Sequence, residues 1–420
     1  MADSGRSTVD ISVATAANNI EAVPSLLEKL AKKNESLQTI SEQGRKELLS
    51  LARALVRSLE TPRETMAKHC WAQTGVSAAV SLGVEVGLWK LMVSNGDRPQ
   101  LVQELATVLS IEPALLSRLM RHLGALGYVT ETGENEYKPT NYSKALSLDI
   151  IGNGYIAMLS GTSSAVLLFH EYARKRGYKN PDNASDTSLM MTSDTNLDVF
   201  SWLRSLGYGA HFNDHMAGYR HGRTPWMVPS VYPVEARLVK GADTSCDAPF
   251  LVDIGGNRGH DLKEFHKYHP STPGRLYLQD TEIVIHSIES LPDAITSMPY
   301  DFFTEQPIKG ARAYYIHSCL HDWPDDKCKM ILSHIRDAMK HGYSKLLIHE
   351  FVMPRTGAHW EATSLDLIMM SLVSAKERTE TEWYSLIESV LGLKIVDIWQ
   401  GGEGAESLIE CELVAVEESQ

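Results

Sequence analysis

The sequence predicts a doubly wound α/β domain in the C-terminal part of the chain. From Ala248 onward, short apolar runs alternate with segments of helical spacing, which is the pattern of a parallel sheet covered by helices. The first run, 250–254, leads directly into Gly255, Gly256 and Gly259. Such a turn lets the backbone approach a ligand closely and points helix N–H groups toward it. We therefore expect a ligand site at the carboxyl ends of these strands.

The remaining elements of this domain follow in order along the chain. The sequence predicts strands at 250–254, 276–279, 313–317 and 345–350, helices at 261–268, 283–291, 325–339, 363–373 and 380–391, and two closing strands at 394–399 and 407–416.

The N-terminal half is predicted to be mostly helical. We expect disorder in residues 1–22, a helical and winged-helix part in 23–150, and a helical connection in 151–247 before the α/β domain of 248–420. Aromatic and methionine side chains in 151–247 are typical either of a pocket wall or of a simple core.

The segment 64–92 is apolar on more than one helical face. Such a helix is buried, either in its own core or in a subunit interface. We expect an interface, and hence a homodimer.

The pattern helix, helix, hairpin over residues 98–142 predicts a winged-helix module, which serves either DNA recognition or packing and dimerisation. The hairpin carries Glu131, Glu134 and Glu136, and the chain has a net charge of −13. Both features disfavour nucleic acid as a partner. A winged-helix regulator is kept as an alternative function.

Composition indicates an ordinary globular protein. Of the 420 residues, 43% are apolar and 22% are charged, and the five cysteines are scattered and odd in number. These features are typical of reduced thiols and a cytoplasmic protein. The sequence shows neither a signal-peptide apolar region nor an apolar run that we expect to cross a membrane.

Asp280 ends the second apolar run of the α/β domain. An acid at the end of the second strand can accept hydrogen bonds from both hydroxyls of a ribose. The glycine turn and Asp280 together therefore predict a site for a nucleoside-type cofactor.

Three polar clusters follow later strands and carry His317 with His321, Glu350, and Glu377. A histidine beside two carboxylates is a general-base arrangement, because a carboxylate orients the ring and stabilises its charged form. His317 and His321 also have a spacing that can bind zinc, but no third ligand accompanies them at fixed spacing. We expect no metal.

These residues occur in the motifs LVDIGGNRGHD, YLQD, YDFF, LHDWPDDKC, HEFVMP, DLIMM and KERTETEW. In order and spacing, from about Thr74 to the C-terminus, the chain resembles class I S-adenosylmethionine-dependent O-methyltransferases of the plant and fungal type. The resemblance implies a Rossmann-like methyltransferase domain that binds S-adenosylmethionine and releases S-adenosylhomocysteine.

The resemblance also implies a role for each motif residue. The base would be His321, flanked by Glu350 and Glu377. Gly255, Gly256 and Gly259 would bind the methionine end of the cofactor. Asp280 would bind its ribose, and Asp301 and Phe302 would bind its adenine.

Two positions depart from the family pattern. Asn257 stands where a third glycine is usual, and asparagine tolerates left-handed backbone angles. His317 stands where the family has Arg or Lys, and we expect it to bind the cofactor as well, through a contact that differs from the one usual in the family.

The predicted reaction is methylation of a phenol or enol hydroxyl on a small secondary metabolite, such as a fungal polyketide. Relatives on the same fold catalyse pericyclic or dehydration reactions with the same cofactor, so such an enzyme is the alternative.

Overall fold

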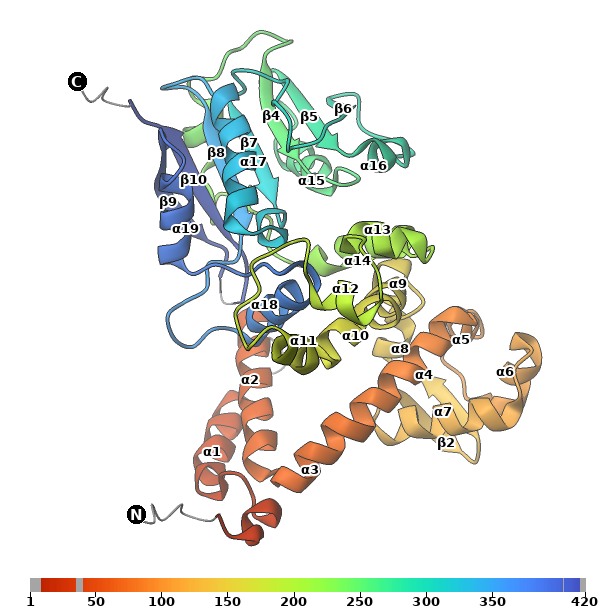
Figure 1. Cartoon of the computed structure of the whole chain (residues 1–420). Coiled ribbons are helices and arrows are strands. Elements are labelled where there is room, and N and C mark those ends of the chain that lie inside the picture. The colour runs from red at the N-terminus through yellow and green to blue at the C-terminus, as the bar shows by residue number, and fades with distance from the viewer. Residues whose placement is uncertain (1–8, 35–40, 403, 416–420) are drawn as a thin grey trace, which may run out of the picture. The chain divides into compact units, whose positions relative to one another are not determined.

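The computed structural model describes residues 9–34, 41–402 and 404–415, and it divides into two compact units, Met1–Ser147 and Leu148–Gln420. The helical connection predicted for 151–247 belongs to the second unit. Each unit is described by itself (Figure 1).

The first unit begins with helices. Their bounds are α1 Val23–Asn34, α2 Glu42–Leu59, α3 Pro62–Ala67, a π-helical turn Lys68–Gln73, α4 Thr74–Glu85 and α5 Leu88–Ser94. Thr61 starts α3 with a capping box to Glu64, which satisfies two N–H groups at the helix start.

The predicted disorder of residues 1–22 is corrected in part. Residues 1–8 lie outside the described part, but Ile11–Thr15 and Ile20–Ala22 form 3-10 helices. Each has a side-chain cap, because Asp10 accepts a hydrogen bond from the Ser12 backbone and Asn19 accepts one from the Ala22 backbone.

A winged-helix arrangement completes the first unit. It comprises β1 Gln100–Leu101, α6 Val102–Leu109, α7 Pro113–Ala125, β2 Val129–Gly133, β3 Glu136–Pro139 and α8 Asn141–Ala145, with strands in the order β1-β3-β2. The part of segment 64–92 that includes Val80, Leu88 and Trp89 is buried inside this unit, whereas Trp71 is 68% exposed.

The second unit opens with helices. They are α9 Asp149–Gly154, a π-helical turn Tyr155–Ser160, α10 Gly161–Leu167, α11 Phe169–Lys175, α12 Ser188–Thr192, α13 Val199–Ser205 and α14 Gly209–Arg220. Of these, α13 and α14 line the cavity described below. The chain is interrupted between α10 and α11 at Leu168, whose backbone angles leave the helical region.

One run in this region corrects the expectation that no segment is long and apolar enough to span a membrane. Asp149–Leu167 is long and apolar enough to do so by length and composition, and so is the bent pair Pro62–Glu85 and Leu88–Ser94 taken together. Core helices of globular proteins can have the same length and composition. Here α9 packs on α14, and α10 packs on α12 and on α18 (Trp360–Val373).

The α/β domain contains a seven-stranded sheet in the order β6-β5-β4-β7-β8-β10-β9. Its strands are β4 Pro249–Ile254, β5 Arg275–Asp280, β6 Ile295–Pro299, β7 Ala313–His317, β8 Lys345–Glu350, β9 Leu393–Gln400 and β10 Ser407–Leu413. The first five are parallel to one another, and β10 is antiparallel to both β8 and β9. The fold class predicted from the sequence is confirmed.

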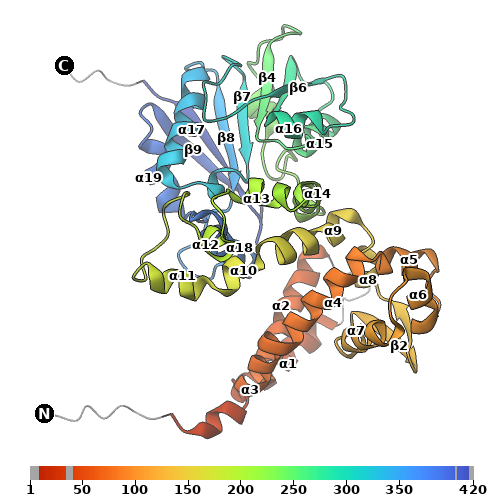
Figure 2. The same ribbon diagram turned by 45° about the vertical axis from the view of Figure 1, so that its right-hand side comes forward.

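Helices cover both faces of this sheet (Figures 1 and 2). One face packs on α17 (Asp325–Ala338) and α19 (Glu380–Glu388), and the other packs on α15 (His260–Tyr268) and on the segment 226–238. The strand order reverses between β4 and β7. Ligands of such sheets bind at the carboxyl ends of the strands beside this reversal.

Two details of the sheet region differ from expectation. Strand β6 is not among the predicted strands, since only Ile295 of its five residues is buried. The helix predicted for 283–291 is α16, Glu282–His286, and it ends at Ser287. Beyond it, Ile288 and Leu291 pack against the core without helical structure.

Candidate active site

A cavity of about 760 Å³ opens at the carboxyl ends of β4, β5 and β7. Most predicted site residues line it, namely Gly255, Gly256, Asp280, Asp301, Phe302, His317 and His321. The other three predicted residues do not line it: Gly259 caps α15, and Glu350 and Glu377 are buried behind His321.

The glycine turn after β4 requires glycines for two reasons. Gly255 and Gly259 have φ of 73° and 75°, which side chains rarely adopt. A Cβ at Gly255 would also lie 2.7 Å from the sulfur of Cys319, and a Cβ at Gly256 would overlap the carboxylate of Asp253. Asn257 has φ of 51°, so the expectation that asparagine tolerates this left-handed position is confirmed.

Asp280 lies at the end of β5 and connects that strand to the glycine turn. Its Oδ2 accepts a hydrogen bond of 2.8 Å from the backbone N–H of Asn257, and its Oδ1 accepts one of 2.7 Å from Thr281. Burial raises the pKa of this carboxyl. The carboxylate is thus fixed at the edge of the cavity, where a ribose hydroxyl is expected.

His321 lies in a 3-10 turn, Leu320–Asp322, between β7 and α17, and is 5% exposed. Its Nδ1 lies 2.7 Å from Oε1 of Glu377 and 3.5 Å from Oε2 of Glu350. Its Nε2 lies 3.6 Å from Oδ1 of Asp322. The carboxylates therefore surround the ring, and the Nε2 edge is the one without a short hydrogen bond.

The pKa of His321 follows from two opposing effects. Burial lowers it, but the carboxylates of Glu350, Glu377 and Asp322 outweigh burial and hold it well above its ordinary value. Burial also raises the pKa of Asp322, to about 6. The carboxylates therefore stabilise the charged form of the imidazole ring.

Glu350 has a second function in this cluster. It is fully buried, and its Oε1 accepts hydrogen bonds from the backbone N–H groups of Cys319 (3.0 Å) and Leu320 (2.8 Å). One carboxylate therefore both shapes the turn and contributes negative charge beside the ring of His321.

His317 is engaged by two carboxylates. Its Nδ1 lies 2.9 Å from Oδ2 of Asp261, and its Nε2 lies 3.3 Å from Oε2 of Glu406. Burial and the nearby Arg220 lower the pKa of His317. The carboxylates of Asp261 and Glu406 have a larger, opposite effect, and the resulting pKa is about 9. His317 lines the cavity as a cation whose two nitrogens already have partners.

The residues Asp261, Glu406 and Arg220 were not predicted as site residues. Asp261 follows the glycine turn directly in the sequence, which is a signal that could have found it. Glu406 lies in the hairpin between β9 and β10, far from every motif, and no sequence pattern indicates it.

Two groups of side chains among the described residues have a geometry that can bind a metal ion. These are His321 with Glu350 and Glu377, and His317 with His349 and Glu406. In both groups a histidine already pairs with a carboxylate, His321 with Glu377 at 2.7 Å and His317 with Glu406 at 3.3 Å.

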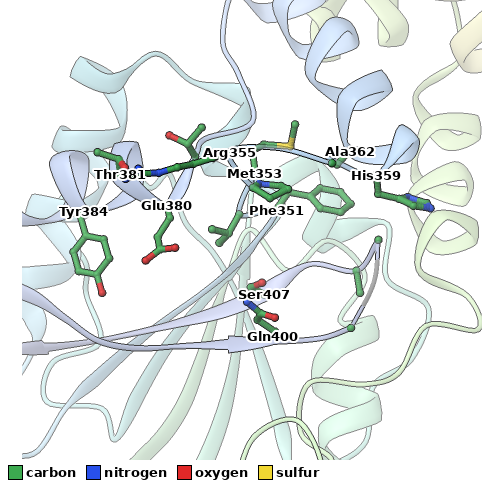
Figure 3. Close-up of a pocket in the computed structure, with 17 residues that line it drawn as sticks. Phe351, Met353, Arg355, His359, Ala362, Glu380, Thr381, Tyr384, Gln400 and Ser407 are labelled. Atoms are coloured by element: carbon green, nitrogen blue, oxygen red, sulfur yellow. The ribbon is translucent and has the colours of Figure 1, made fainter. Parts of the chain in front are cut away.

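A second cavity, of about 730 Å³, lies elsewhere in the same unit (Figure 3). Phe351, Met353, Tyr384 and Ser407 are among the side chains around it. No predicted site residue lines it. The first cavity is therefore the candidate active site.

The candidate site fits S-adenosylmethionine, the cofactor that the sequence resemblance implies. The glycine turn leaves room where a Cβ would collide with its neighbours. Asn257, Arg258 and His260 line the cavity and have buried polar atoms without a hydrogen-bond partner among the described residues. Such atoms are expected where a polar ligand binds.

Comparison with known proteins connects this geometry to a chemistry. The family described as an O-methyltransferase domain matches residues 235–391. The O-methyltransferase mfmE of Annulohypoxylon moriforme is 36% identical over 363 residues, which cover 86% of this chain and 89% of that protein. The O-methyltransferase mpaG of Penicillium brevicompactum is 34% identical over 398 residues, covering 93% and 98%.

Solved structures are similar over almost the whole chain. One described as a pericyclic reaction enzyme has a TM-score of 0.84 at 28% identity and covers 93% of this chain and 100% of that one. The complex of LepI with SAM has a TM-score of 0.83 at 28% identity, covering 93% and 99%. OxaC in complex with sinefungin and meleagrin has a TM-score of 0.82 at 25% identity, covering 94% and 99%.

Proposed function

Because the chain belongs to the S-adenosylmethionine-dependent O-methyltransferase family, we propose that His321 is the general base of the methyl transfer. The enzyme uses S-adenosylmethionine as its cofactor. The observation that supports the base is the 2.7 Å contact between Nδ1 of His321 and Glu377. It fixes the ring and leaves Nε2 without a short hydrogen bond, on a residue that lines the cavity.

In this mechanism Nε2 of His321 accepts the proton of a substrate hydroxyl. A phenol has a pKa of about 10, so a nearby base is needed at neutral pH. Glu350 and Glu377 stabilise the imidazolium that forms. When bound, the cofactor would supply an electrophilic methyl group to this oxygen, with S-adenosylhomocysteine as the leaving group. Residues that hold the reactants in a fixed orientation would contribute much of the rate.

The wall around the base supports an apolar acceptor. It is formed largely by the helices α13, α14 and α18, and its apolar side chains include Met158, Phe200, Phe212, Met216, Met369 and Leu372. Aromatic and methionine side chains favour a flat hydrophobic ligand. We therefore propose that the acceptor is a phenol or enol hydroxyl of a secondary metabolite.

We propose that the motif residues bind the successive parts of the cofactor. Asp280 would bind the ribose, Asp301 and Phe302 the adenine, and the turn of Gly255, Gly256 and Gly259 the methionine end, with His317 close to that end.

A second candidate function is a pericyclic reaction or dehydration with the same cofactor. The observation that favours it is the similarity to the structure described as a pericyclic reaction enzyme. Incubation with S-adenosylmethionine and candidate polyketides, followed by mass spectrometry, separates the two. A product heavier by one methyl group, formed with S-adenosylhomocysteine, supports transfer. A product of unchanged mass, or one lighter by one water, supports the second candidate.

We also propose that residues 23–150 form a dimerisation domain and that the enzyme is a homodimer. Several large apolar side chains of the first unit are exposed, namely Leu27, Leu49, Val56, Leu59, Met66 and Trp71. Exposed apolar surface of this kind is typical of subunit interfaces. A cytoplasmic location is proposed as well, since all five cysteines are free.

A further inference from the structure

The N-terminus of α15 presents unsatisfied polar atoms to the cofactor cavity. Nε of Arg258 and Nε2 of His260 are buried and have no hydrogen-bond partner among the described residues. The first turn of this nine-residue helix also has no side-chain cap. Free N–H groups at a helix start favour an anion, and an adjacent guanidinium strengthens that preference.

The other charged groups around this point are already paired. Arg220 forms an ion pair with Asp261, and Asp261 and Glu406 engage both nitrogens of His317. Asp280 accepts hydrogen bonds from backbone N–H groups at the end of β5. The carboxylates among these groups disfavour an anion. Arg220 is held in a more buried ion pair than Arg258, since the side chains of Arg220 and Asp261 are 21% and 7% exposed.

Arg258 keeps the capacity to bind an anionic ligand. Its side chain is 31% exposed, and its Nη1 donates one hydrogen bond of 3.2 Å to Oδ1 of Asp214. Asp214 has a second donor, since its Oδ2 accepts a hydrogen bond of 2.8 Å from Asn153. A guanidinium has five N–H donors, so most of those on Arg258 remain for a ligand.

We propose that Arg258 binds the α-carboxylate of the methionine moiety of the cofactor. S-adenosylmethionine carries this carboxylate at the end opposite its adenine, and a guanidinium can bind a carboxylate through two parallel hydrogen bonds. His260 is a weaker candidate for the charge, because burial lowers its pKa and keeps its ring neutral. The proposal concerns only cofactor binding, so it can be tested independently of whether the enzyme transfers a methyl group.

The test compares two ligands by calorimetry without any methyl acceptor. S-adenosylhomocysteine contains the carboxylate, whereas 5′-methylthioadenosine has the same nucleoside and thioether but no amino acid. Arg258→Gln should lower the affinity for S-adenosylhomocysteine by about tenfold or more, because a charge-assisted pair of hydrogen bonds is lost. The affinity for 5′-methylthioadenosine should stay at the wild-type value.

Two further variants separate binding from folding. Arg258→Lys keeps the charge without the planar fork, so its affinity for S-adenosylhomocysteine should lie between those of wild type and Arg258→Gln. Asp214→Asn removes the ion-pair partner of Arg258 and should leave that affinity equal or higher. A parallel loss of affinity for both ligands in Arg258→Gln would show a structural role and overturn the proposal. Unchanged affinity for both ligands would overturn it too.

Discussion

Arg378 donates a hydrogen bond of 2.9 Å from Nη1 to the carbonyl oxygen of Leu320, the residue immediately before His321. Its Nη2 donates another of 2.9 Å to the carbonyl oxygen of Trp323. The side chain is fully buried, so these acceptors compensate for removing a charge from water. Arg378 therefore binds carbonyl groups of the turn that carries the proposed base, and Glu350 binds N–H groups of the same turn.

Arg378→Met should destabilise the fold and slow the reaction. It removes the charged donor from the carbonyls of Leu320 and Trp323, at about 1.5–3 kcal/mol for a hydrogen bond that involves a charged group. The carbonyls then keep only the weak donor Cys328 Sγ and, for Leu320, the backbone N–H of Trp323. Thermal unfolding should therefore occur at a lower temperature, and methyl transfer by the folded variant should fall because the turn is less ordered. Arg275→Met is the matched control, since Arg275 is 45% exposed and its side chain pairs with the exposed Asp247. Equal losses in both variants would contradict this role of Arg378.

Asp280→Asn should weaken cofactor binding. The amide retains an acceptor for the N–H of Asn257 but loses the charge that strengthens a hydrogen bond from a ribose hydroxyl, at about 1.5–3 kcal/mol. The calorimetric affinity for S-adenosylmethionine should fall by about tenfold or more. Asp280→Ala should lose more, because the glycine turn then loses its carboxylate as well. If both variants bind like wild type, Asp280 is not part of the cofactor site.

The sequence could predict the central sheet well, for a physical reason. Parallel strands buried on both faces are continuous apolar runs, and the predicted bounds 313–317 and 345–350 are those of β7 and β8. The strand β6 escaped prediction because its residues Thr296 and Ser297 are polar and only Ile295 is buried. A short strand at the sheet edge shows little apolar pattern.

The candidate site was predictable only where residues follow strands of the parallel sheet. His321, Glu350 and Glu377 come from motifs that the sequence displays. Glu406 does not, since it reaches His317 only because β10 pairs with β8 and places Ser407 beside Glu350. Sequence periodicity carries no information on that antiparallel pairing.

The apolar surface of the first unit predicts the oligomeric state. Light scattering at micromolar concentration should give twice the 46.6 kDa of one chain. Trp71→Glu should shift the protein toward monomer, because it places a charge on an exposed apolar surface. Leu391→Glu is the control, since Leu391 is similarly exposed, at 66%, but lies in the second unit. A wild-type monomer would contradict the proposed dimer.

His321→Gln should abolish most of the methyl transfer while sparing the cofactor. Glutamine has a similar volume but cannot accept the proton, so the rate should fall by about 10²–10⁴, the usual contribution of a general base. Calorimetric affinity for S-adenosylmethionine should stay close to wild type, because Asp280 and the glycine turn are unchanged. A variant that melts early but transfers methyl normally while folded would show that His321 has only a packing role.

The pH dependence of the rate tests the role of Glu377. Only the neutral ring of His321 accepts a proton, so the rate should rise with pH and level off above the pKa of His321, which the structure holds above the ordinary value of about 6.5. Glu377→Gln removes one of the charges that raise this pKa. The inflection should therefore move to lower pH, and the plateau should fall by less than in His321→Gln, since orientation is lost but the base remains.

The same shift has a consequence for stability, with a definite sign. Because the pKa of His321 is higher in the folded than in the unfolded state, its contribution is fully present below about pH 6.5 and is lost as pH rises through the folded pKa. Thermal melts should therefore show Glu377→Gln destabilised more at pH 6 than at alkaline pH. Glu380→Gln is the control, because Glu380 lines the second cavity and should move neither the inflection nor the melts. An inflection that is the same in Glu377→Gln and wild type would show that the pH dependence does not report His321.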